Sequence, residues 1–389
     1  MSRRPMTIVI FAGFFQLGML FIMWGILLPD IARNLAMSEV ISGALFTLFS
    51  LGMMSGAILG GKYASRFDFL SLFAVLCGID AALLLIIASF SHWAGVLITV
   101  FVIGVVSSGM ITIGHTLIAQ LYTEKRFAMM GLMDFMFSLG TFAASFFVTL
   151  LYLHDDNWRL PLRVLAFTLL LLAAYTWMAA RQHSKRVQGQ PKAPKTSLRY
   201  NDVIRQPVFL LLAMVSFGYG AVEFGNANWF VSYASNGLAL PGDVARNLLA
   251  CFTAGMVVSR LTFAYFLRFF SIHRLVVIMA SMSLAGAVGV KLGNDVLTIG
   301  GGNLLLGLGL GGLFPLMLSA AMNIDAEKGP LLSGVTIIGN SLGVQLASFS
   351  TGLWASLAPL TIAFWVIPIA AIWLWATAWF FSRQLKHGH

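Results

Sequence analysis

Twelve apolar runs, each long enough to cross a bilayer, alternate with short polar segments along the chain. A transmembrane helix needs roughly 20 predominantly apolar residues, because the hydrocarbon core is about 30 Å thick and a helix rises about 1.5 Å per residue. Irregular backbone and open strand edges cannot satisfy their polar groups in hydrocarbon, so each run predicts a helix. The pattern therefore predicts an all-α membrane protein with twelve transmembrane helices. The runs fall at about 6–29, 40–61, 69–90, 94–121, 127–153, 160–180, 208–235, 246–267, 272–291, 296–322, 331–353 and 358–381.

A long polar segment divides these runs into two sets of six. The division predicts an N-terminal six-helix half at 1–180, a linker at 181–207 and a C-terminal six-helix half at 208–389. A faint repeat supports two pseudo-symmetric halves, since residues 52–56 read Gly-Met-Met-Ser-Gly and residues 255–259 read Gly-Met-Val-Val-Ser. Parallel six-helix repeats with a binding site at their interface are the plan of one large class of membrane transporters.

Composition narrows the class of protein. Of 389 residues, 59% are hydrophobic and 10% are charged, against roughly 25% charged in an ordinary soluble domain, which excludes a soluble globular enzyme. No run carries a His-Glu-x-x-His pair, and we expect no intramembrane enzyme. The two cysteines, Cys77 and Cys251, both lie in apolar runs and offer no metal-binding spacing, so we expect no metal and no cofactor.

The excess of positive charge lies at particular connections. Lys and Arg total 24 against 14 Asp and Glu, giving +10, and residues 181–207 alone hold seven cations against the single acid Asp202. The excess therefore belongs to one loop and does not indicate a nucleic-acid-binding surface. With the N-terminus inside, the inner connections hold 18 cations and the outer ones five, so the positive-inside rule predicts cytoplasmic termini and a cytoplasmic linker in an inner membrane. The first run is too long for a secretory signal, and we expect it to be retained as a span.

Ionisable side chains inside apolar runs are costly, and they usually face a cavity or a partner. Glu223 in the seventh run lies about 22 Å from the inner end of its helix, counted at about 1.5 Å per residue. Tyr219 and Asn226 share its helical face and Trp229 lies beside that face, so this group predicts a site for a polar ligand. The alternative is a buried structural hydrogen bond to a neighbouring helix.

Other polar residues of the second half are candidates for the same site. Arg260 in the eighth run has three interpretations: it complements an anionic substrate, pairs with an acid, or extends to the inner surface. Asn340 in the eleventh run, with Thr336 one turn earlier, is a hydrogen-bonding candidate, and so are Asn303 and Gln345.

The first half contributes its own ionisable candidates. Asp134 in the fifth run lies about 12 Å from the inner boundary. Because burial favours the neutral form of a carboxyl group, Asp134 can carry a proton, although a carboxylate paired with a cation at the helix end is the alternative. His115 in the fourth run is either a proton relay or a hydrogen-bonded structural histidine. The position of Asp30 favours a solvated helix end, and that of Asp80 favours packing against a polar partner.

Glycines are concentrated in two of the runs. Gly52, Gly56 and Gly60 recur every four residues along one face, the spacing that lets two helix backbones approach closely. The tenth run holds seven glycines before Phe314-Pro315. This predicts either a gating helix that bends at the proline or close helix packing.

Short motifs in both halves are similar to those of one family of membrane proteins. They are Trp24-Gly25 with Asp30-Ile31, the stretch 219–223 with Trp229 and Tyr233, Phe314-Pro315, Ile337-Ile338-Gly339, and the stretch 104–138. On these motifs the chain resembles the major facilitator superfamily, specifically its fucose:proton-symporter-like branch, and within that branch the TsgA-type proteins. The resemblance covers nearly the whole chain, although each motif is short.

The resemblance implies a place for Asp30 in the central cavity, where it takes part in substrate or proton handling. The sequence differs from the pattern of the family at two places. Sugar-transporting members have a glutamate in the fourth span, whereas residues 110–115 here have none, which counts against fucose-like sugar transport. The superfamily's loop after the second span usually has an aspartate four positions beyond its glycine, and Ser65 stands there after Gly61. This predicts a weaker or differently built gating ion pair.

Together these features predict a proton-coupled secondary transporter of a small polar molecule, with two halves that rock around a cavity near the midplane. In this prediction Glu223, Asn226 and Trp229 face Asp30 and Asp134. The expected partners are a small-molecule substrate, protons and the lipid bilayer, with no nucleic acid and no obligatory protein partner. The alternatives are efflux of a drug or of a carboxylate-rich metabolite such as a siderophore, and a non-transporting sensor that recruits a partner through its basic linker.

Overall fold

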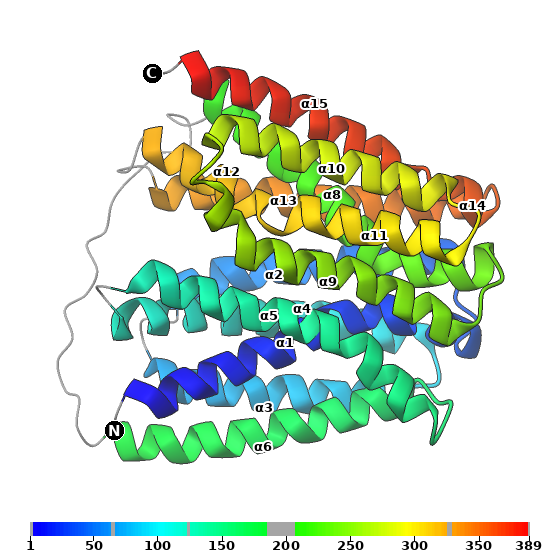
Figure 1. The fold of residues 1–389 in the computed structure, drawn as a ribbon. Coiled ribbons are helices and arrows are strands. Elements are labelled where there is room, and N and C mark those ends of the chain that lie inside the picture. Colours follow the sequence, from blue (N-terminus) through cyan, green and yellow to red (C-terminus); the bar gives the residue numbers. More distant parts are fainter. Residues whose placement is uncertain (1–2, 64–66, 123–124, 185–206, 325–328, 388–389) are drawn as a thin grey trace. The chain divides into compact units, whose positions relative to one another are not determined.

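The chain is helical throughout the part that the structure describes. The computed structural model describes residues 3–63, 67–122, 125–184, 207–324 and 329–387, and every regular element within these ranges is a helix (Figure 1). The all-α fold predicted from the apolar runs is therefore confirmed.

The helices follow the predicted runs closely. Those that precede the linker are α1 (Arg3–Asn34), α2 (Glu39–Tyr63), α3 (Phe69–Ile87), α4 (Trp93–Leu121), α5 (Arg126–Tyr152) and α6 (Arg159–Ser184). Those that follow it are α8 (Pro207–Ser232), the π-helix η2 (Tyr233–Gly237), α9 (Gly242–Phe266), α10 (Ile272–Leu292), α11 (Val296–Gly311), α12 (Leu313–Ile324), α13 (Gly329–Ala355), α14 (Leu360–Ala363) and α15 (Val366–His387). Most of the predicted linker, residues 185–206, lies outside the described residues, and so do residues 64–66 of the loop that carries Ser65.

Eleven segments of the described chain are long and apolar enough to cross a membrane. The predicted eleventh run forms α13, a helix of 27 residues, but α13 is not among these eleven. The chain is thus a multi-pass membrane protein, and the count of twelve crossings stays a prediction.

Two of the predicted runs are interrupted. The tenth run divides into α11 and α12 at Gly312, three residues before Pro315, whose missing N–H cannot continue the helical hydrogen bonds. A break in the helix is therefore present near the proline. The twelfth run contains the short helix α14 followed by α15. In addition, α8 ends in the π-helical turn η2, which widens the helix over Tyr233–Gly237.

Contacts among the described residues divide the chain into two compact units. The first unit contains α1, α3 to α6 and the part of α2 that starts at Leu48. The second contains α8 to α15 and residues 38–47, which include the first turns of α2. Those turns group with the second unit because Gly43 and Gly352 let the backbones of α2 and α13 meet, and a Cβ on Gly43 would lie 2.9 Å from the carbonyl oxygen of Ser348.

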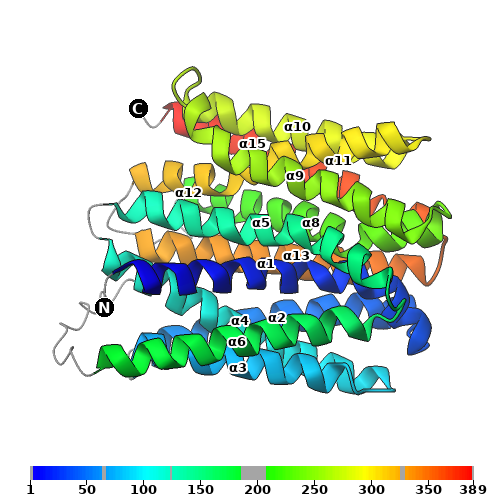
Figure 2. The same ribbon diagram turned by 60° about the horizontal axis from the view of Figure 1, so that its bottom comes forward.

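The same order of helix pairing occurs in both units. In the first unit α1 packs along α5 and α3 packs along α6, and the views in Figures 1 and 2 both show α3 beside α6. In the second unit α8 packs along α13 and α10 packs along α15. The first helix of each unit thus pairs with the fifth span, and the third with the sixth. This pairing supports the prediction of two related six-helix repeats.

The repeated glycines occupy equivalent places in the two units. A Cβ on Gly52 of α2 would collide with the backbone carbonyl of Phe101 in α4. A Cβ on Gly255 of α9 would collide in the same way with the backbone carbonyl of Leu304 in α11. Each glycine therefore lets the second span of its unit touch the fourth, as the small-residue spacing predicts.

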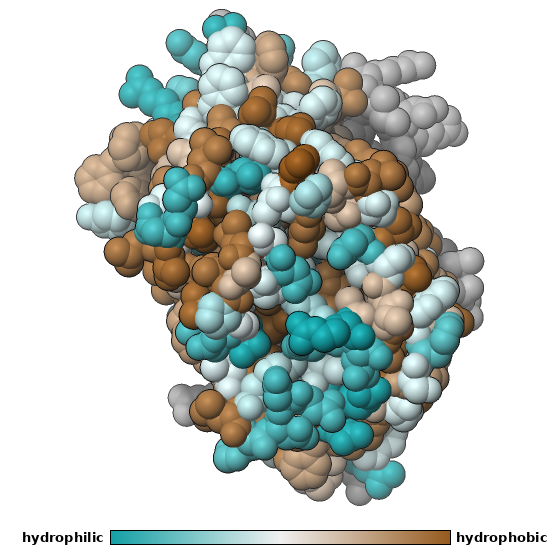
Figure 3. All heavy atoms as spheres, turned by 90° about the vertical axis from the view of Figure 1, so that its right-hand side faces the viewer, coloured by the Kyte–Doolittle hydropathy of each residue, from teal (hydrophilic) through white to brown (hydrophobic). Residues whose placement is uncertain are grey.

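The outward faces of the helices carry large apolar side chains. Ile98, Phe167, Leu261 and Ile369 are examples that are more than half exposed in the isolated chain, as expected for side chains that contact lipid. The face at the right of Figure 1, where α14 and neighbouring connections lie, carries hydrophilic side chains between hydrophobic ones (Figure 3).

Candidate functional site

An ion pair inside the second unit is the centre of the candidate site. Arg260 of α9 places Nη2 3.9 Å from Oε1 of Glu223 in α8, and the two side chains are only 20% and 13% exposed. Of the three interpretations of Arg260 made from the sequence, pairing with an acid is the one that the geometry shows. Because neither group is fully solvated, the interaction between them is screened less than a surface salt bridge.

Aromatic residues cover this ion pair. Tyr219, one turn before Glu223 on α8, is buried and interacts through its hydroxyl group with both Glu223 and Arg260. The ring of Phe314, at the start of α12, lies against the ring of Tyr219 with 5.2 Å between centroids. Three spans therefore bring a carboxylate, a guanidinium, a phenol and an aromatic ring together, which is a set of groups suited to a polar ligand with an apolar portion.

Asn226 lies one turn beyond Glu223 and makes a different contact. Its Nδ2 donates a hydrogen bond of 3.0 Å to Oδ1 of Asn303 in α11, and both side chains are completely buried. Among the described residues no partner reaches Oδ1 of Asn226 or Nδ2 of Asn303. One acceptor and one donor of this pair are therefore available to a ligand. Asn226 lies one helical turn from Glu223, so both groups are near the ion pair.

Trp229 is an anchor of α8 in this structure. Its side chain is completely buried, and its indole N–H donates a hydrogen bond of 3.1 Å to the backbone carbonyl of Ser348 in α13. Asn228 donates to the hydroxyl oxygen of the same serine at 3.0 Å. These contacts correspond to the structural alternative stated for the seventh run, a hydrogen bond to a neighbouring helix, and they fix how α8 is rotated against α13.

Asn340 of α13 lies against the same part of α8. A Cβ on Gly220 would collide with the backbone and side-chain oxygens of Asn340, so the two helices touch directly beside Tyr219. Within the described chain, Oδ1 of Asn340 is buried and accepts no hydrogen bond. Asn340 is therefore a candidate to accept a hydrogen bond in the second unit, as the sequence predicts.

In the first unit, His115 and Asp134 form a second pair. Nε2 of His115 in α4 lies 3.4 Å from Oδ1 of Asp134 in α5, and Nδ1 of His115 lies 2.9 Å from the carbonyl oxygen of Ile111. A carbonyl only accepts, so Nδ1 carries a hydrogen. A hydrogen bond between Nε2 and the carboxyl group then needs one further proton, held on the imidazole or on the carboxyl. The two side chains, 36% and 51% exposed, are thus placed so that a proton on either one completes a hydrogen bond between them.

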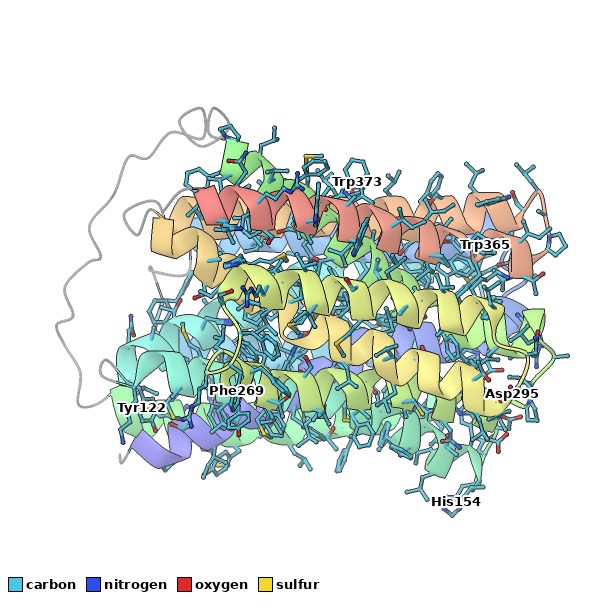
Figure 4. The ribbon with its side chains drawn as sticks, turned by 45° about the horizontal axis from the view of Figure 1, so that its top comes forward. Tyr122, His154, Phe269, Asp295, Trp365 and Trp373 are labelled. Atoms are coloured by element: carbon cyan, nitrogen blue, oxygen red, sulfur yellow. The ribbon has the colours of Figure 1, made fainter. Side chains whose placement is uncertain are left out.

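Asp30 does not lie near Asp134. Asp30 accepts a hydrogen bond of 3.0 Å from the hydroxyl group of Tyr152, the last residue of α5, and faces Arg33 at 3.9 Å. Asp134 is early in the same helix, about 27 Å away along its axis at about 1.5 Å per residue. Figure 4 shows Tyr122, which precedes α5, and His154, which follows it, at opposite ends of the first unit. Asp30 and Asp134 therefore lie at different levels along α5, and their part in one cavity stays a prediction.

Asp80 has the polar partner that its position favours. The hydroxyl group of Ser107 in α4 donates a hydrogen bond of 2.9 Å to Asp80, whose side chain is completely buried. Asp80 thus ties α3 to α4.

Several partners of the predicted residues were not apparent from the sequence. Tyr152 and Ser348 belong to spans distant in the sequence from Asp30 and Trp229, so no spacing rule relates them. Residues 339–343 read Gly-Asn-Ser-Leu-Gly and match the Gly-x-Ser-x-Gly pattern of some hydrolases. In the structure they lie inside α13, whereas that pattern requires a sharp turn between a strand and a helix. Among the described residues no group of three or more His, Cys, Asp or Glu side chains is placed to hold a metal ion.

A set of apolar spans with ionisable side chains paired inside it defines a multi-pass membrane protein of the transporter class. The chain belongs to the Major Facilitator Superfamily, because the model of that family matches residues 9–348. The resemblance inferred from the motifs is thereby confirmed. Among curated relatives, Protein TsgA of Shigella boydii serotype 18 is 23% identical over 298 residues, covering 72% of this chain and 70% of that protein.

Solved structures of the same fold come from transporters. The crystal structure of the nucleoside transporter NupG matches with a TM-score of 0.75 at 14% identity, covering 99% of this chain and 100% of that one. A structure of the E. coli fucose:proton symporter FucP matches with a TM-score of 0.65 at 14% identity, covering 98% and 99%. At these identities the likeness shows the fold alone. The family itself makes this chain a transporter and not an enzyme.

Proposed function

We propose that the protein is a proton-coupled secondary transporter of a small polar molecule and works by alternating access. The observation that carries the proposal is the Glu223–Arg260 ion pair inside the second unit. Burying two charges within a span is costly, and a hydrophobic pair of similar size would pack there without that cost. Charges kept in such a place indicate a function that uses them.

The ion pair explains how proton and substrate movements are coupled. Protonation of Glu223 removes the negative charge that Arg260 faces, and Arg260 cannot lose its own proton. An oxygen atom of a polar substrate then takes the place of the carboxylate, so the proton and the substrate each strengthen the binding of the other. For a monoanionic substrate the empty site and the doubly loaded site are both neutral, whereas a site loaded with only one of the two carries a net charge, so reorientation is favoured for the neutral forms. For a neutral substrate the coupling rests on its oxygen atom, which solvates the guanidinium of Arg260 once Glu223 is protonated.

The His115–Asp134 pair is the second proton site in this proposal. The contact of 3.4 Å between Nε2 of His115 and Oδ1 of Asp134, with Nδ1 of His115 facing the carbonyl of Ile111, supports a proton carried between the two side chains. The two pairs belong to different units, so each unit contributes one ionisable centre. Asn226 with Asn303, and Asn340 beside Tyr219, supply the hydrogen-bonding groups that orient a polar substrate near the ion pair.

The proposed topology follows from the distribution of charge. The excess of cations on one set of connections supports an inner-membrane protein whose termini and basic linker lie in the cytoplasm. The two units are then the two halves that alternate, joined by the linker at 181–207. Their shared helix pairing supports this role.

The direct test is uptake into proteoliposomes under an inward proton gradient. Because solved neighbours transport fucose and nucleosides, labelled fucose and a nucleoside mixture are the first probes, followed by pooled metabolites. We expect at least one solute to accumulate with the wild type and its gradient-driven accumulation to be lost in Glu223→Gln.

Asp80→Asn is the matched control, since it also neutralises a buried carboxyl group but one whose partner is Ser107. Uptake should survive in this variant. Gradient-driven uptake that persists in Glu223→Gln at the wild-type level would contradict the assignment of Glu223.

Export of an anionic metabolite is a second candidate, and the guanidinium of Arg260 in the site is the observation that favours it. A carboxylate-rich solute has the charge to pair with Arg260 when Glu223 is protonated. The same vesicles distinguish the two directions. A symporter accumulates the solute when protons flow inward, whereas an exporter of the antiport type releases preloaded solute.

A further inference from the structure

The interruption between α11 and α12 lies directly beside the ion pair. In a regular helix the N–H of residue 315 would donate to the carbonyl oxygen of Gly311, but Pro315 has no N–H. The carbonyl of Gly311 instead accepts a hydrogen bond of 3.4 Å from Nε of Arg260. The next available donor of the helix, the N–H of Leu316, bonds to the carbonyl of Gly312 at 3.2 Å.

A second group at the interruption is also satisfied by α9. The N–H of Gly312 donates a hydrogen bond of 3.1 Å to the hydroxyl oxygen of Ser259, the residue immediately before Arg260. The two glycines make this approach possible, since a Cβ on Gly311 would lie 2.8 Å from the Cβ of Ser259, and a Cβ on Gly312 would lie 2.5 Å from the Cβ of Phe263. Two consecutive residues of α9 thus contact the backbone at the break through hydrogen bonds, while the N–H of Gly312 also donates to the carbonyl of Leu310.

Arg260 therefore contacts the helix interruption and Glu223 at once. Its Nε contacts the Gly311 carbonyl while its Nη2 faces Glu223, and the two nitrogens belong to one rigid, planar guanidinium group. A displacement that carries Nη2 away from Glu223 also moves Nε against the Gly311 carbonyl. The charge on Glu223 and the hydrogen bonding of the helix interruption are connected through this one side chain.

We propose that Pro315 is a positioning residue of the transport site: by leaving the Gly311 carbonyl without a helical donor, it holds Arg260 against Glu223 and ties the α11–α12 interruption to the charge of Glu223. The proposal rests on the function proposed above, in which Glu223 gains and loses a proton. When Glu223 is neutral, Arg260 turns toward other acceptors, its bond to Gly311 weakens, and the interruption opens more often.

Within the described part of the chain, Glu223 and Tyr219 of α8 are titratable groups that interact with Arg260. Neither α11 nor α12 nor α13 contains an ionisable residue within its described helix. No charged side chain in these described helices therefore offsets the change in electrostatic interaction that Arg260 undergoes when the charge of Glu223 changes.

Hydrogen exchange tests this connection without a substrate. The full chain in lipid nanodiscs is compared as wild type, Glu223→Gln, Pro315→Ala and the double variant, and exchange is followed in peptides that cover 308–318. We expect Glu223→Gln to raise the exchange rate of the amides after Gly311 by about threefold or more. In Pro315→Ala the restored N–H bonds to Gly311 and replaces Arg260, so there we expect Glu223→Gln to change the rate by less than about 1.5-fold.

Pro29, which also lies inside a helix, provides the control for a general effect of replacing proline. Glu223→Gln should keep its full effect in the Pro29→Ala background. Pro315→Gly restores the N–H as well, and it takes the place of Pro315→Ala if that variant does not fold. An equal effect of Glu223→Gln with and without Pro315, or no effect in the wild-type background, overturns the proposal.

Transport supplies the readout that separates this proposal from the function on which it rests. With any solute that the wild type accumulates, Pro315→Ala should shift the midpoint of the pH dependence of uptake, whereas Pro29→Ala should leave it in place. If the wild type transports nothing, the proposed function fails while the exchange result still decides the role of Pro315. If uptake is proton-driven and its pH midpoint is the same in both variants, the positioning role fails alone.

Discussion

At the scale of single residues, the second unit buries polar groups that have few alternative partners. Glu223 and Arg260 could be singled out in the sequence because ionisable residues are rare inside apolar runs. Their mutual contact could not be predicted, since α8 and α9 are separate helices and rotation about each axis decides which residues meet. The contact between Asn226 and Asn303 could not be predicted either, because Asn303 is one of several polar residues in the apolar runs.

The Asn226–Asn303 pair yields a stability prediction. Replacing Asn303 by leucine leaves the buried amide of Asn226 without its partner, and we expect this to destabilise the protein by about 1–3 kcal/mol. The double variant Asn226→Leu/Asn303→Leu should be more stable than either single variant, because no unsatisfied amide remains. Thermal unfolding in detergent measures the difference. A double variant that is as unstable as the sum of both singles would show that the pair is not coupled.

Asp295 yields a prediction about pH. It caps α11 by accepting hydrogen bonds from the backbone N–H of Thr298 at 2.9 Å and from its hydroxyl group at 2.7 Å. These hydrogen bonds lower the pKa of Asp295 below its usual value. A carboxyl whose folded-state pKa is lowered stabilises the fold above its unfolded-state pKa, and the contribution is lost as pH falls through the folded-state value. Figure 4 shows Asp295 at the end of the second unit opposite to Phe269.

We therefore expect Asp295→Ala to unfold at a lower temperature than the wild type at pH 7, with the difference shrinking as the pH falls below about 4. Asp295→Asn keeps an acceptor for the cap but cannot ionise, so it should lose less stability and show less dependence on pH. A constant difference between wild type and Asp295→Ala at all pH values would contradict the assignment.

At the scale of helices, the apolar runs predict the elements by their length alone, because about 20 apolar residues are needed to span the hydrocarbon core. The spacing of polar residues within a run is not needed for this prediction. The location of the break in the tenth run needed the structure. Pro315 indicated a bend, and the structure has a break at Gly312, where Ser259 and Arg260 of α9 contact the backbone. A helix break and close packing of glycines thus occur in the same run.

Two glycines of α11 allow the effect of helix contact on stability to be measured apart from the effect of helix propensity. A Cβ on Gly307 would collide with the carbonyl of Phe252 in α9, whereas a Cβ on Gly301 meets nothing within 4 Å. We expect Gly307→Ala to lower the unfolding temperature and the yield of folded protein. Gly301→Ala, in the same helix, should be neutral or stabilising by up to about 1 kcal/mol. Similar losses in both variants would mean that helix contact is not what requires Gly307.

At the scale of the whole molecule, the sequence predicts two sets of six spans, and the contacts of the described chain form two units with the same helix pairing. The first turns of α2 depart from the predicted division, because Gly43 and Gly352 attach them to the second unit. The amino-acid composition shows the polar linker and so predicts a boundary there. It cannot show that residues 38–47 pack against α13, because that contact depends on the three-dimensional arrangement.

The linker distinguishes transport from a recruiting role. Deletion of residues 187–196, which lie outside the described part of the chain, should leave proton-driven uptake within about twofold of the wild type, because a shorter chain still joins the two halves. A sensor that recruits a partner through the basic linker would lose its function in the same variant. Uptake by the deletion variant in proteoliposomes measures this directly, and loss of uptake with normal folding would favour the sensor.

The central claim is that Glu223 and Arg260 couple solute movement to proton movement. The most direct measurement imposes a solute gradient across proteoliposomes without a proton gradient and follows the internal pH with a trapped dye. For a transported solute, the account predicts that an inward solute gradient changes the internal pH in the wild type and in Asp80→Asn, and that Glu223→Gln shows no pH change. Solute entry into wild-type vesicles at constant internal pH would contradict it.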